Sequence, residues 1–228
     1  MTDFVVSAGP AEVHRRLRER LNEPAPGRIQ LLAGPRQVGK TTLLLEIARE
    51  FGDRARYAAA DAPEASVPGF WDRFWADTES AAENGKTIVL LDEVHLLPDW
   101  AAALKARWDH LRRRRLPVHV IATGSSALQV THGSRESLAG RFERMVFAHW
   151  SAAALADTFK MAATDAAREA VRFGTYPGAW ALRTDPVRWR AYLRDAIIEP
   201  AIGRDILALG QVRRPALLRQ VFAVAVGS

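Results

Sequence analysis

Two kinds of hydrophobic pattern alternate along the chain. Short unbroken apolar runs predict buried strands, and apolar residues that recur every three or four positions predict amphipathic helices. Strands are predicted at 29–32, 56–60, 86–92, 117–123 and 144–147, and helices at 11–21, 40–51, 70–83 and 98–115. Unbroken apolar strands separated by helices indicate an α/β fold, with a parallel sheet sandwiched between helices.

The pattern changes after Trp150. Four helices are predicted there and no strand, at 152–159, 164–173, 186–198 and 215–226. We therefore expect three parts, which are an N-terminal helix and linker (1–27), an α/β core (28–150) and a small helical region (151–228) that acts as a lid.

The first predicted strand runs into a glycine-containing loop. Gly34, Gly39, Lys40 and Thr41 match the phosphate-binding pattern G-x-x-x-x-G-K-[ST] between a strand and a helix. Glycines let the backbone curl so that its N–H groups, with the positive end of the helix dipole, surround phosphate oxygens. Lys40 is expected to reach the β- and γ-phosphates, and Thr41 to bind Mg²⁺. The candidate nucleotide contacts are Gly34, Pro35, Arg36, Gln37, Val38, Gly39, Lys40, Thr41 and Thr42.

Two consecutive acids, Asp92 and Glu93, end the strand at 86–92. Ligands of open α/β sheets lie beyond the carboxyl ends of the strands, so these acids are expected near the phosphate loop. Neighbouring residues of a strand point to opposite sides, which predicts different tasks. We assign Asp92 to the Mg²⁺ site, through Thr41 or water, and Glu93 to the attacking water.

Two later positions are weaker candidates for the same chemistry. Ser125 follows the strand at 117–123 and is expected to sense the γ-phosphate, with Ser126 as second choice and a helix N-cap as the alternative. Arg141 is expected to stabilise charge in the transition state, from its own subunit or a neighbour's. A structural surface arginine is the alternative for Arg141.

Several residues carry a plain structural alternative. Phe70, Trp71, Phe74 and Trp75 are paired four positions apart and favour core or interface packing over a ligand cage. The basic run 112–115 favours solvated cations at a helix end over a nucleic-acid contact. His119 is expected in the core, whereas His95 is expected either to support the acids or to lie on the surface.

Composition limits the setting. The 228 residues include 32 Lys and Arg against 26 Asp and Glu, so a basic surface permits a nucleic-acid partner without requiring one. There is no cysteine, which excludes disulfides and thiolate metal sites and fits a reducing compartment. The sequence shows neither a basic-then-apolar leader nor a long apolar span, so we expect a cytoplasmic protein without a membrane partner.

The motifs as a set resemble the prokaryotic AAA+-type ATPases in which a P-loop core precedes a winged-helix-like helical region and a DUF4143 domain. The resemblance rests on 34–42, Leu91–His95, 123–126, 137–141 and a Gly-x-Tyr-Pro motif at 174–177. It implies ATP hydrolysis with Mg²⁺ and an AAA+-like core. Members are usually longer, so we expect the C-terminal domain to be absent from this sequence.

The combined prediction is an ATPase that uses hydrolysis to change shape, with ATP and Mg²⁺ as ligands and a homo-oligomer as a possible assembly. GTP is disfavoured because neither Asn22 nor Asn84 lies in an Asn-Lys-x-Asp motif. The rival is a nucleotide-gated switch that exposes a DNA- or protein-binding surface, with incidental hydrolysis. A small-molecule kinase fits less well, because an Asp-Glu strand end suits water activation.

Overall fold

A computed structural model describes residues 4–7, 9–124, 138–206 and 215–227. Its centre is a six-stranded sheet in the order β1-β6-β2-β5-β4-β3, and every neighbouring pair is parallel. The α/β prediction is confirmed. The strands are β1 (Phe4–Ser7), β2 (Ile29–Ala33), β3 (Ala55–Ala59), β4 (Thr87–Asp92), β5 (Val118–Gly124) and β6 (Phe142–Phe147).

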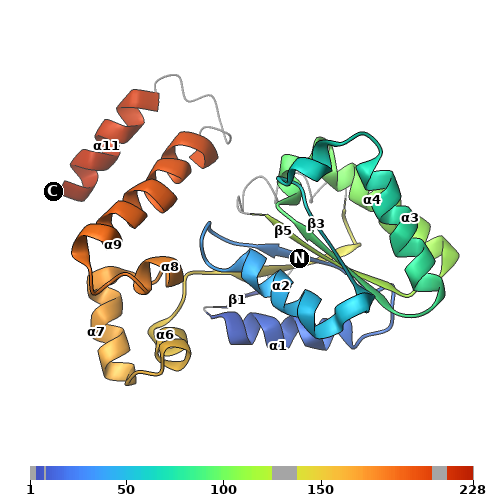
Figure 1. The fold of residues 1–228 in the computed structure, drawn as a ribbon, viewed down its shortest axis with the longest axis horizontal. Coiled ribbons are helices and arrows are strands. Elements are labelled where there is room, and N and C mark those ends of the chain that lie inside the picture. The colour runs from blue at the N-terminus through green and yellow to red at the C-terminus, as the bar shows by residue number, and fades with distance from the viewer. Residues whose placement is uncertain (1–3, 8, 125–137, 207–214, 228) are drawn as a thin grey trace.

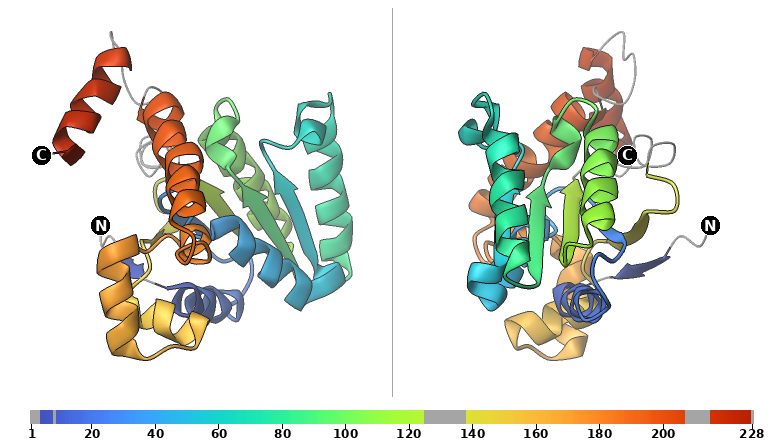
Figure 2. Two further views of the ribbon diagram at one scale, coloured as in Figure 1. Left: turned by 60° about the vertical axis from the view of Figure 1, so that its left-hand side comes forward. Right: turned by 90° about the vertical axis from the view of Figure 1, so that its right-hand side faces the viewer.

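Helices cover both faces of the sheet (Figures 1 and 2). Side chains on one face, such as Leu32, pack in a buried cluster with α1 (Pro10–Leu21) and α2 (Lys40–Phe51). Side chains on the other face, such as Leu31, pack with α3 (Phe70–Glu83) and α4 (Trp100–Arg114). The unbroken apolar runs are thus strands buried on both faces, as the sequence predicts. Short 3₁₀ turns lie between these elements, namely η1 (Gly52–Arg54), η2 (Pro63–Ser66) and η3 (Val94–Leu96).

Strand β1 was not predicted. It is only four residues long and pairs with β6 alone, at the edge of the sheet. Four residues are too few to display a hydrophobic period. The other five strands lie within two residues of their predicted bounds.

The described chain after Phe147 is helical and contains no strand. The described residues therefore contain no β-wing of a winged helix, and a lid function for this region stays a prediction. None of the helices among the described residues has the length and apolarity that a bilayer span requires. The helices of this region are α6 (Ala152–Phe159), α7 (Ala163–Phe173), α8 (Pro177–Trp180), α9 (Pro186–Tyr192), the π-helical turns η4 (Leu193–Ile198) and η5 (Ala201–Asp205), and α11 (Pro215–Gly227).

Beyond β2 the backbone passes unusually close to the end of β6. A Cβ atom added to Gly34 would lie 2.1 Å from the carbonyl oxygen of Phe147, which is backbone and cannot rotate away. Residue 34 must therefore be glycine if the loop is to follow this path.

We predict that Gly34→Ala destabilises the fold by about 1–3 kcal/mol, because the two backbones must separate. Urea unfolding measures the change. Gly203→Ala is the matched control, since its added Cβ meets only the flexible end of Arg219 and should cost far less. Equal stability of the two variants would contradict the close approach.

His119 lies in the middle of the sheet, as predicted for a core histidine. Its side chain on β5 is buried, and burial together with the charge of Lys86 lowers its pKa to about 4. The ring is therefore neutral at pH 7.

A lowered pKa makes stability depend on pH. Between the unfolded value of about 6.5 and the folded value near 4, the unfolded chain binds more protons, so the free energy of unfolding falls as pH decreases. We predict that His119→Gln, which cannot be protonated, flattens this decrease. Urea unfolding across the window tests it, and an unchanged slope would refute the assignment.

Candidate nucleotide-binding site

The carboxyl edge of the sheet brings the two predicted motifs together. The phosphate loop follows β2, the acids end β4, and β5 lies between these two strands. Gly39, at the last loop position before α2, has φ +101°, in the left-handed region that glycine tolerates. Helix α2 then starts at Lys40, so the N–H groups of its first turn directly follow the loop.

The Lys40 ammonium is held inside the loop. The side chain is buried, and Nζ lies 3.0 Å from the carbonyl oxygen of Gly34 and 2.7 Å from that of Pro35. A buried cation needs such partners, because desolvation without them is costly. The contacts place a positive charge at the base of the curled backbone.

A cavity of about 360 Å³ opens over this loop. Its size is within the range of small-molecule sites. Its wall combines loop residues with Glu93 and with two residues of the C-terminal helical region, and consists of Arg36, Gln37, Gly39, Lys40, Thr41, Thr42, Glu93, Pro177 and Gly178.

Asp92 is the buried member of the acid pair, with a residue exposure of 3%. Its Oδ1 accepts hydrogen bonds from the Thr123 hydroxyl and, at 3.1 Å, from the Glu93 N–H, and Oδ2 accepts from the Tyr57 hydroxyl at 3.2 Å. Burial and the negative charge of Asp92 raise the pKa of Tyr57. Sequence reasoning missed Tyr57 and Thr123, because only the strand order brings them beside Asp92.

Glu93 follows directly after the end of β4 and has a different environment from Asp92. Its φ of +50° turns the chain, and its side chain lines the cavity that Lys40 also lines. The Glu93 Oε2 atom lies 3.2 Å from Nδ1 of His95, whose side chain is only 3% exposed. His95 is therefore a buried neighbour of the acid and not a surface histidine.

The structure does not bring Arg141 to this cavity. Its carbonyl oxygen accepts from the N–H of Ile29, the first residue of β2, whereas the phosphate loop follows the last residue. The guanidinium pairs with Asp109 at 2.8 Å, lies over the Trp108 ring and lowers the pKa of Asp109. Arg141 thus lies at the opposite edge of the sheet, and an action on a nucleotide bound in its own subunit is not compatible with this position.

Two further predictions concern the serines after β5 and the basic run 112–115. Ser125 and Ser126 lie outside the described residues. In the basic run, Arg114 pairs with Glu79 and Glu83, and Arg112 lies over the Trp108 ring. These contacts occupy part of the run within its own subunit.

Tyr192 of the C-terminal helical region and Trp150, directly before that region, contact the phosphate loop, and sequence reasoning predicted neither contact. The Tyr192 hydroxyl donates to Oε1 of Gln37 at 3.1 Å, and the Trp150 indole N–H donates to the carbonyl of Val38 at 2.8 Å. Pro177, the last residue of the Gly-x-Tyr-Pro motif, and Gly178 after it line the cavity. The sequence analysis used this motif only for the family resemblance.

Comparison with solved structures finds several matches with the same TM-score. A structure titled for katanin self-assembly is 18% identical with a TM-score of 0.48, covering 68% of this chain and 56% of that chain. A DNA replication initiation factor and AMPPCP-bound DnaA from Aquifex aeolicus are each 19% identical with TM-scores of 0.48. They match 75% of this chain and 53% and 54% of their own. The chain thus spans about half the length of these structures.

A search of curated proteins finds no match. A protein-family comparison does match, and it identifies residues 26–155 as an AAA domain. This segment is more than half of the chain and contains the strands β2 to β6 with both motifs at their carboxyl edge. The chain therefore belongs to the AAA domain family of P-loop ATPases.

Proposed function

We propose that the protein binds ATP with Mg²⁺ and hydrolyses it, and that turnover moves the C-terminal helical region relative to the phosphate loop. The observation that carries the proposal is the shared cavity, which is lined by Glu93 as well as by Lys40 and Thr41. An acid, a buried cation and a hydroxyl around one space of this size suit the positioning of a triphosphate and a water molecule.

The residues present fit a magnesium ion. Thr41 and Asp92 offer the hard oxygen ligands that Mg²⁺ prefers, and phosphate oxygens and water complete its shell. The three described donors to Asp92 are neutral, so its negative charge is available to a cation. Bound Mg²⁺ would neutralise charge on the phosphates.

In this proposal the chain's own groups divide the work. Lys40 and the loop amides hold the phosphates, and Glu93 orients and polarises the attacking water, with His95 3.2 Å from its carboxylate. Ser125 contacts the γ-phosphate. Arg141 acts only across an interface between copies, because it lies at the other edge of its own sheet. ATP is preferred to GTP on the absence of a guanine-reading motif.

The second candidate is a nucleotide-gated switch that binds DNA or a protein, with incidental hydrolysis. The contact from Tyr192 to Gln37 favours it, because it joins the helical region directly to the loop. Trp150, directly before that region, also contacts the loop at Val38. A change in loop conformation on nucleotide binding would reach the helices without any bond being cleaved.

Two substitutions separate binding from hydrolysis. Lys40→Ala should weaken binding of a fluorescent ATP analogue by at least about tenfold, because it removes the buried charge. Glu93→Gln should keep binding and lower phosphate release roughly a hundredfold. Lys160→Ala and Glu46→Gln, both at exposed positions, are the controls and should match the native protein.

The same measurements decide between the two candidates. If native protein binds MgATP but releases phosphate no faster than Glu93→Gln, hydrolysis is excluded and the switch remains. Undiminished binding of MgATP by Lys40→Ala would contradict both candidates.

The coupling between loop and helices has its own test. We predict that MgATP changes amide hydrogen exchange across residues 177–198, and that Tyr192→Phe reduces this response, since the lost hydrogen bond contributes about 1 kcal/mol. Tyr176→Phe is the control, because it keeps the ring contact with His149. An identical response in native protein and Tyr192→Phe would show that this contact transmits nothing.

A further inference from the structure

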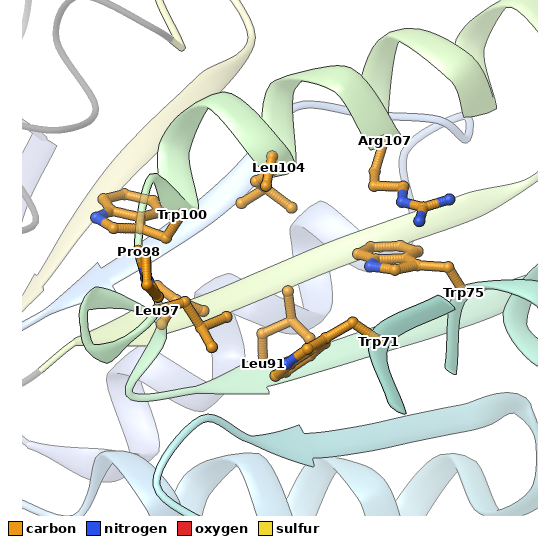
Figure 3. Close-up of a pocket in the computed structure, with 10 residues that line it drawn as sticks. Trp71, Trp75, Leu91, Leu97, Pro98, Trp100, Leu104 and Arg107 are labelled. Atoms are coloured by element: carbon orange, nitrogen blue, oxygen red, sulfur yellow. The ribbon is translucent and has the colours of Figure 1, made fainter. Parts of the chain in front are cut away.

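A second cavity, of about 380 Å³, lies on the other side of β4, between α3 and α4 (Figure 3). Figure 3 shows Trp71 and Trp75 of α3 on one side of it and Trp100 on the other, with Leu104 of α4 above. Leu91 of β4 also forms part of its wall. No residue that lines this cavity lines the one over the phosphate loop.

The wall is apolar apart from Arg107, and half of its ten residues are buried. Val94, Leu91 and Leu104 are between 2% and 4% exposed, and Trp75 and Trp100 are below 10%. Exposed residues at its rim include Pro98 and Ala103. Protein interiors are normally close-packed, and apolar cavities of this kind take up apolar molecules. Three indole rings around one space favour a flat aromatic guest, through stacked and edge-to-face contacts.

One positive charge lies beside these rings. The Arg107 guanidinium lines the cavity and lies over the Trp75 ring, with 5.9 Å to the ring centroid. The guanidinium donates a hydrogen bond to Asp72 at 2.8 Å, and the Asp72 side chain is 82% exposed. Exposed ion pairs of this kind contribute little, and a guanidinium has five N–H donors. Arg107 can therefore also bind an anionic group of a guest.

We propose that this cavity binds a small planar aromatic molecule that carries one acidic group. The aromatic body lies among Trp71, Trp75 and Trp100, and the acidic group meets Arg107. The cavity offers no phosphate loop, so this guest is not the nucleotide.

The position of the cavity allows a bound guest to affect the nucleotide site indirectly. Leu91 and Val94 flank Asp92 and Glu93 in the sequence, and both line the cavity. A bound guest therefore contacts the segment that orients Glu93. This regulatory consequence rests on the proposed function, whereas the binding itself does not, and the experiment below measures binding without turnover.

Two related fluorescent probes test the proposal on the full chain. Anilinonaphthalene sulfonate is aromatic and anionic, and N-phenylnaphthylamine is its neutral relative. Native protein should bind one equivalent of either probe, and the two probes should compete. Excess MgATP should change the affinity of either probe by a limited factor at most, because coupling between separate sites is reciprocal but does not exclude the guest. Absence of saturable binding, absence of competition between the probes, or complete displacement by MgATP would each overturn the proposal.

Substitutions then locate the site. Ala103→Trp fills the mouth and should weaken both probes about tenfold or more, whereas Ala102→Trp, at the neighbouring exposed position outside the wall, should bind like native protein. Arg107→Met keeps the apolar stem and should weaken the anionic probe about fivefold while changing the neutral probe by less than about twofold. Native affinity in a folded Ala103→Trp, or equal effects of Arg107→Met on both probes, would refute the assignment. The competition measurement needs no variant, so it decides the matter even if Ala103→Trp does not fold.

Discussion

The backbone contact between Gly34 and Phe147 is the constraint on which the site depends. A side chain at residue 34 would collide with the Phe147 carbonyl, so the absence of a Cβ lets the loop lie directly against the end of β6. From Phe147 the chain continues within three residues to Trp150, whose indole N–H donates to Val38 of the same loop. The phosphate loop is therefore held from the side of β6 as well as by β2 and α2. The helical region is attached at that point.

The two consecutive acids at the end of β4 lie in different environments, because Asp92 is buried and Glu93 lines the cavity. Asp92 stays in the strand geometry and is buried beneath Thr123 and Tyr57, which fix both of its oxygens. Glu93 takes a left-handed backbone conformation and turns its side chain to the cavity wall. Thr123 joins the two, since its Oγ1 contacts both the Asp92 carboxylate and, at 3.3 Å, the Glu93 N–H. The end of β4, the residue after it and the end of β5 are thus joined by hydrogen bonds.

Sequence reasoning reached what is encoded locally. The glycine loop, the buried strands and the acids at a strand end can each be recognised within a few residues. The structure places the loop and the acids at the carboxyl edge of the sheet that these strands form. Sequence reasoning could not give the order of the strands, which decides that Thr123 lies beside Asp92. Arg141 lies at the opposite edge because it directly precedes β6, and parallel strands all start at that edge. Nor could sequence reasoning place Tyr192 beside Gln37, because 155 positions separate them and no periodic pattern links them. The roles assigned to the site residues stay predictions.

The aromatic pairs of α3 show the same boundary between local and tertiary information. Spacing at four residues indicates correctly that Trp71 and Trp75 share one helix face, and such a face normally packs into the core. Whether it packs fully depends on the partner helix, and α4 presents Ala103 and Arg107 to this space together with Trp100 and Leu104. A small residue and a long charged one leave room that larger apolar side chains would fill. The cavity is therefore a property of the pair of helices, and neither sequence pattern alone contains it.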